Sequence, residues 1–364
     1  MAGQFKMLIA VNDQKLSAPL VRNYRERGWE VFPARDAFFT ISIALRERPQ
    51  AIVLDADLPG GGQTALQRIR QSIHTSSIPV IALVKGDSRQ RNDMLKAGAQ
   101  ICLDIASLKT TSIDSAVQKA MGTIVSVTTA PAHAIQNPER LTALAESGLL
   151  DTQQSCGLDQ LTLLTAKILS VPIALLSLVD HDRQFFKSHF GLSRELAATR
   201  HTPLTHSFCQ WVVSGNEELV IGDANVHPVL RSNLAIRDLG VIAYAGIPVI
   251  ADNNQAIGSF CAIDLKPHNW SEEDLVLLRE LAMVAQAQII VDRLQLEPSR
   301  LAHHSGNPMS MRTLTKGSMA AVSLLRSQNK VLDEAARDFL CEAIVNFGEQ
   351  LLLMPLERRR RRRD

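Results

Sequence analysis

Three aspartates of the N-terminal third follow short apolar runs and are well placed to do chemistry. Asp55 directly follows the run 51–54 and is followed by Asp57, while Asp13 comes just after the run 8–11. Carboxylate oxygens of this kind bind Mg²⁺ and can accept a phosphoryl group. Phosphoryl transfer depends on positioning and charge neutralisation, so such a site also needs a lysine and a hydroxyl for the phosphoryl oxygens. A working site therefore requires all of these groups together.

The segment around Asp55 resembles the phosphorylation loop of bacterial response-regulator receiver domains. The resemblance rests on an aspartate at the end of an apolar run and on the residues that follow it, Asp57-Leu58-Pro59-Gly60. It implies that Asp55 is the phosphoacceptor position of a two-component system protein. It also implies that acidic residues after the first strand hold Mg²⁺.

The other residues that this resemblance requires are largely missing. The acidic pair of the family falls on Asn12 and Asp13, so one negative charge is lost. Asp13 and Asp55 would therefore bind a metal ion only weakly. The hydroxyl position is Val84 and the lysine position is Ile105, and neither side chain can pair with a phosphate. We therefore expect a pseudo-receiver domain in which Asp55 is a retained structural carboxylate.

Short apolar runs alternate with helical patterns over residues 1–121, which predicts an α/β domain with a doubly wound parallel five-stranded sheet. The strands are expected at 8–11, 30–33, 51–54, 80–83 and 101–103. Residues 122–136 lack periodicity and are predicted to be a linker.

Residues 137–297 resemble bacterial GAF sensor domains, because several sequence elements of that family occur in its order. These elements are 171–180, 183–188, 207–209, 222–224, 244–248 and 258–264. The resemblance implies an α+β domain with an antiparallel sheet flanked by helices. It also implies a ligand pocket under the loops on one face of the sheet.

The resemblance leaves the ligand open, since members of this family bind cyclic nucleotides, bilins, haem, small organic molecules or no identified ligand. The pocket candidates are aromatic walls, polar anchors and two thiols: Arg183, His206, Phe208, Cys209, Trp211, Asp223, Tyr244 and Cys261. Each has an alternative role, because aromatic residues also form cores and an aspartate also fixes a turn. Cys209 precedes Gln210 and not a histidine, which argues against a covalently bound bilin. No cofactor is predicted beyond an unidentified small molecule.

The five cysteines are scattered without CxxC spacing, which predicts neither a disulfide framework nor a zinc site. His206 and Cys209 offer only two metal ligands. Cys209 and Cys261 would form a redox pair if the fold brings them together, and are small buried hydrophobic residues otherwise.

A long helix is predicted from Ser271, where Asp274 completes a capping box, and its apolar stripe continues to Leu294. This stripe would pack on its own domain or pair with a second copy in a homodimer. Residues 298–310 are predicted to be a linker and 311–355 a helical hairpin. Because so small a hairpin buries little surface alone, it should dock on the rest of the chain or on a partner.

Positive charge gathers in the tail, residues 356–364. The formal net charge is +2, but six of the 39 basic residues lie in one run, which leaves 33 against 37 acidic residues, a net of −4. The run is Arg358, Arg359, Arg360, Arg361, Arg362 and Arg363. Such a run binds the phosphates of nucleic acid or an anionic membrane, or is a solvated terminus. Without an apolar stretch of about 18 residues or a signal-peptide profile, a cytoplasmic protein is expected.

The sequence carries no cyclase motif, no Walker loop and no kinase ATP lid, so a non-enzymatic signal-transduction protein is expected. It would act with other signalling proteins through ligand- or partner-dependent association. One alternative is an RNA-binding antiterminator-like regulator, for which segments 316–319 and 333–336 with the arginine run argue. The other is a response regulator phosphorylated at Asp55.

Overall fold

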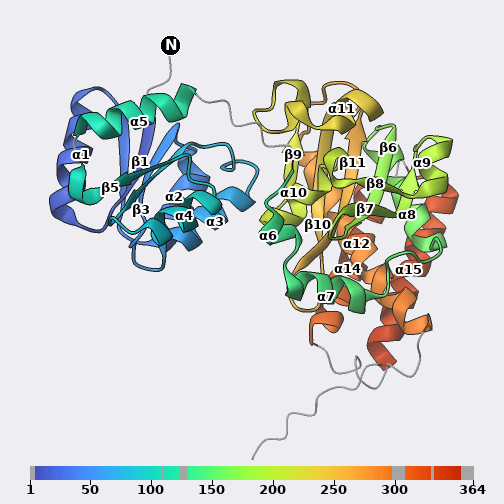
Figure 1. Cartoon of the computed structure of the whole chain (residues 1–364). Helices are drawn as coiled ribbons and strands as arrows, with labels where there is room; N and C mark the ends of the chain where they lie inside the picture. Colours follow the sequence, from blue (N-terminus) through green and yellow to red (C-terminus); the bar gives the residue numbers. More distant parts are fainter. Residues whose placement is uncertain (1–4, 109, 123–128, 297–307, 329–331, 354–364) are drawn as a thin grey trace, which may run out of the picture. The chain divides into compact units, whose positions relative to one another are not determined.

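The structure is a computed structural model that describes residues 5–108, 110–122, 129–296, 308–328 and 332–353. The chain divides between Pro131 and Ala132 into two compact units, which are described separately (Figure 1). Across these described residues, every helix is too short or too polar to cross a membrane.

The first unit is a parallel five-stranded sheet with helices on both faces. Its strands are β1 (Lys6–Ala10), β2 (Glu30–Ala34), β3 (Ala51–Asp55), β4 (Val80–Val84) and β5 (Ile101–Asp104). They are ordered β2-β1-β3-β4-β5, the order of flavodoxin-like doubly wound sheets. This confirms the predicted fold class. The helices are α1 (Gln14–Glu26), α2 (Ala37–Glu47), α3 (Gly62–Gln71), α4 (Ser88–Lys96) and α5 (Thr110–Gly122), with a 3₁₀ turn, η1 (Ile105–Ser107), after β5.

Side chains alternate between two cores on the faces of this sheet, because successive strand residues point to opposite sides. Leu8, Ile52 and Leu54 belong to the core beneath α2, α3 and α4. Ile9 and Val53 belong to the core beneath α1 and α5. Burial of both faces explains why these strands read as continuous apolar runs. It leaves the carboxyl ends of the strands as the edge where polar residues gather.

The second unit contains an antiparallel six-stranded sheet, as predicted. Its strands are β6 (Ile173–Val179), β7 (Arg183–Phe190), β8 (His201–Pro203), β9 (Leu219–Ile221), β10 (Ala243–Ile250) and β11 (Ala256–Asp264). They are ordered β8-β7-β6-β11-β10-β9. The four longer strands, β7, β6, β11 and β10, lie in the middle of the sheet, and the three-residue strands β8 and β9 lie at its edges.

The helices of the second unit surround this sheet. They are α6 (Ala132–Ile135), α7 (Pro138–Ser147), α8 (Cys156–Ile168), α9 (Arg194–Thr199), α10 (Cys209–Gly215), α11 (Leu234–Leu239), α12 (Glu272–Leu296), α14 (Pro308–Ser327) and α15 (Glu334–Leu353), with 3₁₀ turns η2 (Leu204–His206), η3 (Ala224–Val226) and η4 (Leu230–Ser232). The stretch 132–135, which falls in the predicted linker, is helical. Its Ala134 and Ile135 are buried, and the guanidinium of Arg140 donates to the carbonyl of Ile135.

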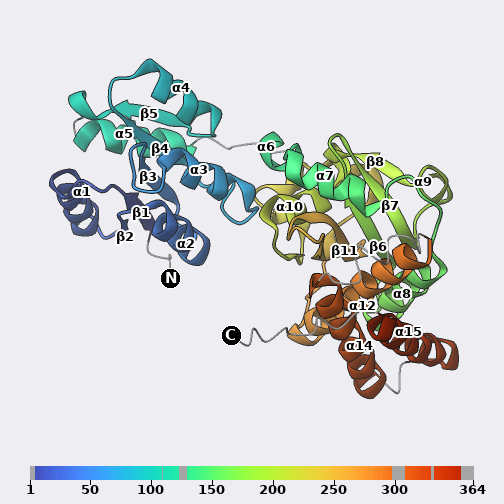
Figure 2. The same cartoon turned by 90° about the horizontal axis from the view of Figure 1, so that it is seen from below.

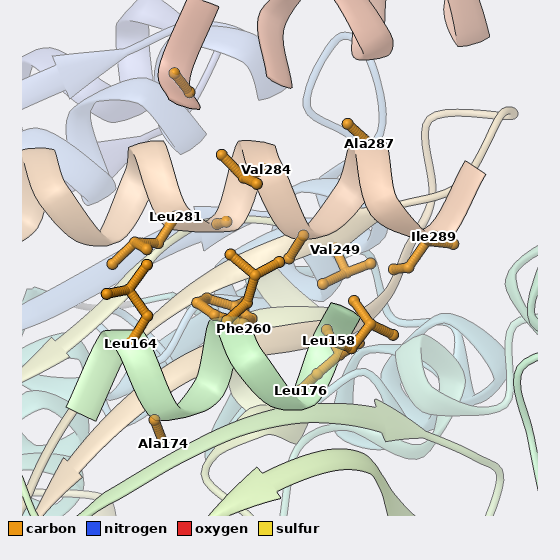
Figure 3. Packing of buried hydrophobic residues seen from close by; sticks show 14 of the residues in the cluster. Leu158, Leu164, Ala174, Leu176, Val249, Phe260, Leu281, Val284, Ala287 and Ile289 are labelled. Atoms are coloured by element: carbon orange, nitrogen blue, oxygen red, sulfur yellow. The ribbon is translucent and has the colours of Figure 1, made fainter. Parts of the chain in front are cut away.

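The helix α12 begins with the predicted capping box. The amide of Asp274 donates to Ser271 Oγ (3.1 Å), and Asp274 Oδ2 accepts from the amide of Ser271 (2.9 Å). The helix then crosses one face of the sheet together with α8. Leu281 of α12 meets Phe260 of β11 and Leu164 of α8 in one buried cluster (Figure 3).

The C-terminal hairpin docks on the opposite side of α12, so that α12 lies between the sheet and the helices α14 and α15 (Figure 2). Ala287 projects from α12 towards this side (Figure 3). Gly317 of α14 approaches so closely that an added Cβ would overlap the Cβ of Ala287. The helices α14 and α15 contribute Leu324 and Phe347, among others, to the same hydrophobic core. The hairpin predicted from the sequence is therefore part of this unit.

The contact at Gly317 gives a test of this docking. We expect Gly317→Ala to lower the free energy of unfolding by about 1–2 kcal/mol, because the added methyl forces α14 away from α12. Gly348→Ala is the matched control, since Gly348 also lies within a helix but has no atom within 4 Å of an added Cβ. It should raise stability by about 0.5–1 kcal/mol through helix propensity alone. Urea unfolding of both variants measures the difference, and equal stabilisation by both would contradict the docking.

Candidate functional site

Asp55 lies at the carboxyl end of β3 and is 7% exposed. Its Oδ1 accepts a hydrogen bond from the amide of Asp57 (3.0 Å), so the carboxylate closes the turn that follows the strand. Burial raises the pKa of Asp55 above its usual range, partly opposed by that hydrogen bond. The amide of Asp57 thus holds the Asp55 carboxylate at the end of the strand, and its structural role stays a prediction.

Asp13, the predicted second metal ligand, is exposed and caps α1. Its Oδ1 accepts from the amide of Lys15 (2.8 Å). In the described part of the chain, three potential ligands come within 4.8 Å of one another only at Asp180, His181 and Asp182, in the turn between β6 and β7. Among the described residues, Asp13 and Asp55 therefore belong to no such group of three side-chain ligands, and the weak metal site expected at these two aspartates stays a prediction.

A lysine that the sequence analysis missed supplies positive charge at this edge. Lys85 follows Val84 at the end of β4, and its Nζ lies 2.9 Å from Asp57 Oδ2. Gln90 fixes the pair: its Nε2 donates to Asp57 Oδ1 (2.7 Å), and its Oε1 accepts from the amide of Lys85 (2.9 Å). The hydrogen bond to Asp57 raises the pKa of Lys85. The ammonium is therefore engaged by Asp57.

Apolar residues occupy the two positions where the receiver resemblance requires a lysine and a hydroxyl. Ile105 lies in η1 and packs against the apolar core beneath α1 and α5. Val84 is buried in the opposite core. Val84 is thus a core residue, and Ile105 is a partly buried residue at the margin of the other core. The sequence signal for Lys85 was its place one residue beyond the end of β4, the strand next to β3.

The second candidate site is a cavity of about 430 Å³ on one face of the antiparallel sheet. Strand register defines that face: Tyr244 pairs with Ile263, and Ile263 pairs with Ile173, so their side chains point the same way. All three line the cavity. The intervening residues, such as Ala262 and Ala174, belong to the core under α8 and α12.

The cavity brings together half of the predicted pocket residues. His206, Phe208, Cys209 and Tyr244 line it, with further apolar walls from β6, β7, α9 and α11. The apolar lining residues are Ile173, Leu175, Phe186, Leu192, Leu196, Ala235, Leu239, Val241, Ile263 and Leu265. The aromatic rings of Phe208 and Tyr244 meet edge to face, with 5.5 Å between their centroids.

The other four predicted residues do not line the cavity. Arg183 turns to the surface, where its Nη2 lies 2.6 Å from Asp151 Oδ2. Asp223 caps η3 by accepting from the amide of Asn225 (2.9 Å), which is the turn role left open by the sequence. Trp211 is a buried residue of α10. Cys261 is buried behind the cavity wall, beside Cys209.

The polar residues of the cavity include two that sequence reasoning missed. In Asp238 of α11, Oδ2 lies 3.0 Å from His206 Nε2 and Oδ1 lies 2.6 Å from Arg237 Nε. Its hydrogen bonds with Arg237 and then with His206 lower the pKa of Asp238 to about 2. Gln184 is buried, and its Nε2 donates to Thr202 Oγ1 (2.7 Å). Their roles depend on how α11 and β7 fold over the face, which no local motif indicates.

Comparison with known proteins identifies the domain that holds this cavity. Residues 154–289 match the family model described as GAF domain, so the second unit contains a GAF domain, as predicted. A cyclic di-GMP phosphodiesterase of Pseudomonas aeruginosa is 30% identical over 144 residues, which are 39% of this chain and 24% of that protein. The chain thus spans about a quarter of the length of this relative.

Solved structures similar to the N-terminal third include two of the receiver type. One is described as a response regulator of Chloroflexus aurantiacus, with 24% identity, a TM-score of 0.32, and coverage of 33% of this chain and 100% of that chain. The other is the receiver domain of a sensor histidine kinase of Pseudomonas aeruginosa, with 24% identity, a TM-score of 0.31 and the same coverage. The first unit has the receiver fold by its strand order and by the place of Asp55 at the end of β3.

The chemistry at Asp55 can be tested with a small phosphodonor and Mg²⁺. We expect no acyl phosphate on the wild-type chain, because Val84 and Ile105 cannot take up the phosphoryl oxygens and Asp57 engages Lys85. The double variant Val84→Thr with Ile105→Lys should regain partial phosphorylation. Intact-protein mass spectrometry measures the added phosphoryl group, and Asp55→Ala in each background is the control.

A phosphoryl group on the wild-type chain that Asp55→Ala removes would overturn this expectation. In that case Lys85→Ala shows whether Lys85 provides the missing charge. A large loss of phosphorylation in Lys85→Ala would identify Lys85 as the substitute for the absent lysine.

Proposed function

We propose that this protein is a non-catalytic cytoplasmic signalling protein whose GAF domain senses a small molecule. The observation that carries the proposal is the cavity on one face of the GAF sheet, with α12 and the C-terminal helices on the other face. A ligand in the cavity would press on side chains whose strand neighbours pack against α12. The receiver-fold domain would serve as a surface for another signalling protein.

The lining of the cavity defines the class of ligand. Eleven of its lining residues are apolar, and the imidazole and carboxyl groups among its described lining are those of His206 and Asp238. The lining includes no lysine or arginine, so a phosphate-rich ligand would enter without a cationic partner. The cavity volume lies in the lower part of the usual range for small-molecule sites. These features favour a compact, mostly apolar molecule with one polar group that reaches His206 and Asp238.

Signalling would require the ligand to bind two arrangements of the domain with different affinity. Strand β11 connects the two faces, since Cys261 lies behind the cavity wall and Phe260, the residue before it, packs under α12. The helix α12 in turn packs on α14 at Ala287 and Gly317. A change in the cavity wall could therefore shift the helical layer through side-chain packing alone.

We do not carry the activity of the related phosphodiesterase over to this chain. The matched region of 144 residues is about the size of the GAF domain and covers 24% of that protein. The sequence carries no cyclase motif, no Walker loop and no kinase ATP lid. A sensory role is therefore the part of the likeness that we carry over.

Partner binding by the receiver-fold domain is supported by an exposed aromatic pair on α2. Phe38 is 75% exposed and Phe39 57% exposed, and their rings pack edge to face. Large exposed aromatic side chains on a folded surface are typical of protein interfaces. We propose that this pair lies in the surface that meets another signalling protein.

The homodimer and the RNA-binding alternative stay predictions. The structure shows which of the surfaces that each would use are packed within the chain. The face of α12 that could have paired with a second copy is packed on α14 within the chain. A dimer would have to use another surface. The segments 316–319 and 333–336 lie next to residues such as Leu314 and Leu340, which belong to the hydrophobic core. The apolar face of the hairpin is therefore packed within its own unit. The arginine run and the rest of the tail lie outside the described residues.

Filling the cavity tests the sensory role. We expect Leu239→Trp to abolish retention of any small molecule that copurifies with the full chain, because Leu239 lines the cavity. Leu234→Trp is the matched control, since Leu234 lies on the same helix outside the lining. Native mass spectrometry of protein purified from its own cells reports bound molecules and subunit number together.

Where nothing copurifies, a panel of small apolar molecules with one polar group replaces the natural ligand, with thermal shift as the readout. The proposal requires a molecule that stabilises wild type and Leu234→Trp but not Leu239→Trp. Equal stabilisation of both tryptophan variants would place the ligand elsewhere, and stabilisation of none by any molecule would remove the sensory role.

A further inference from the structure

Two thiols from distant parts of the chain meet behind the wall of the cavity. Cys261 of β11 pairs with Gly246 of β10, so its side chain lies on the same face as Tyr244. Cys209 is the first residue of α10, which packs on β11 from this side. Cys209 is 3% exposed and Cys261 is fully buried. The other buried cysteine, Cys102, lies in the receiver-fold unit.

A hydrogen-bonded cluster surrounds the sulfur of Cys209. The hydroxyl of Tyr244 donates to Cys209 Sγ (3.3 Å) and lies 2.9 Å from Ser259 Oγ. Gly246 makes room for this cluster, since an added Cβ there would overlap the Tyr244 hydroxyl. Cys261 lies beside this cluster, because its strand partner is Gly246, and it is close enough to act on the ionisation of Cys209. Cys209 therefore faces several donors, an arrangement that stabilises a thiolate.

The two thiols are chemically unequal. The hydrogen bond from Cys261, followed by those from Tyr244 and Ser177, lowers the pKa of Cys209. Burial raises the pKa of Cys261. The thiolate is the reactive form of cysteine, so Cys209 is the thiol of the pair that is more readily activated.

The cavity provides access to this pair. Cys209 and Tyr244 both line it, and its volume of about 430 Å³ is ample for a small peroxide. The mostly apolar walls would also admit an organic hydroperoxide. A reactive thiolate with a neighbouring thiol, at the end of a cavity, is the arrangement that a redox-sensing pair requires.

We propose that Cys209 and Cys261 form a peroxide-sensitive dithiol pair that closes to a disulfide inside the GAF domain. The Cys209 thiolate attacks one oxygen of the peroxide, the O–O bond breaks, and Cys209 becomes a sulfenic acid while the other oxygen leaves as water or an alcohol after taking a proton. Cys261 then attacks the Cys209 sulfur, the S–S bond forms, and the sulfenic oxygen leaves as water with the Cys261 proton. The two thiols give two electrons and the peroxide accepts them.

The disulfide would alter the cavity wall. Cys209 would no longer accept the Tyr244 hydrogen bond as a thiolate, and α10 would be tied to β11 by a covalent bond. This inference concerns the same cavity but does not rest on the ligand proposed above. The chemistry can succeed where no small molecule binds, and it can fail where one does.

The test uses the full chain with Cys156→Ser and Cys341→Ser, which removes the two exposed thiols. After brief exposure to hydrogen peroxide, we expect the intact mass to fall by two hydrogen atoms and peptide mapping to give a Cys209–Cys261 crosslink that a reductant reverses. In the same background, Cys261→Ser should stop at a sulfenic acid on Cys209 that dimedone traps. Cys209→Ser should leave Cys261 unoxidised.

Two further measurements separate this chemistry from loss of structure. Tyr244→Phe removes one hydrogen bond to Cys209 and should slow the oxidation about tenfold while the fold persists. Cys102, buried but without a neighbouring thiol, should stay reduced. The proposal fails if a protein with native circular dichroism keeps both thiols unlinked, if Cys102 oxidises as fast as Cys209, or if the crosslink forms only on heating to the unfolding transition.

Discussion

The second unit depends on the two-residue period of its antiparallel strands. A single sheet separates the apolar cluster under α8 and α12 from the cavity on the other face, and each strand serves both. A shift of one residue in the pairing of β10 with β11 would exchange the two sets of side chains. Register is therefore what keeps the cavity open and the helical layer packed at the same time.

The fold could be predicted largely from the sequence, because burial leaves strong local patterns. Four of the five strands of the first unit read as apolar runs, the exception being β2, and all five lie within one or two residues of their predicted bounds. Several GAF elements occur in one order, and the family match at residues 154–289 agrees with them. The short helix at 132–135 was missed, since two buried residues are too few to produce a periodic signal.

The sites were harder to predict, because they depend on residues that meet only in three dimensions. Tyr244 and Cys209 could be named from their motifs, but Asp238 and Gln184 required the positions of α11 and β7. At the receiver edge, the absence of a lysine at Ile105 was visible from the sequence. The lysine that lies there instead, Lys85, comes from the neighbouring strand and pairs with Asp57. A sequence motif describes residues that are close along the chain, whereas the ion pair of Lys85 and Asp57 joins residues that follow different strands.

Strand β11 carries a consequence for how this chain can evolve. From Gly258 to Asp264, side chains at even-numbered positions such as Phe260 and Ala262 pack in the core beneath the helices. Side chains at odd-numbered positions such as Cys261 and Ile263 lie on the cavity side of the sheet. Substitutions at even-numbered positions are thus constrained by the stability of the core, and substitutions at odd-numbered positions by the chemistry of the cavity wall. Substitutions at every second residue of this one strand would therefore change the lining of the cavity and leave the core beneath the helices unchanged.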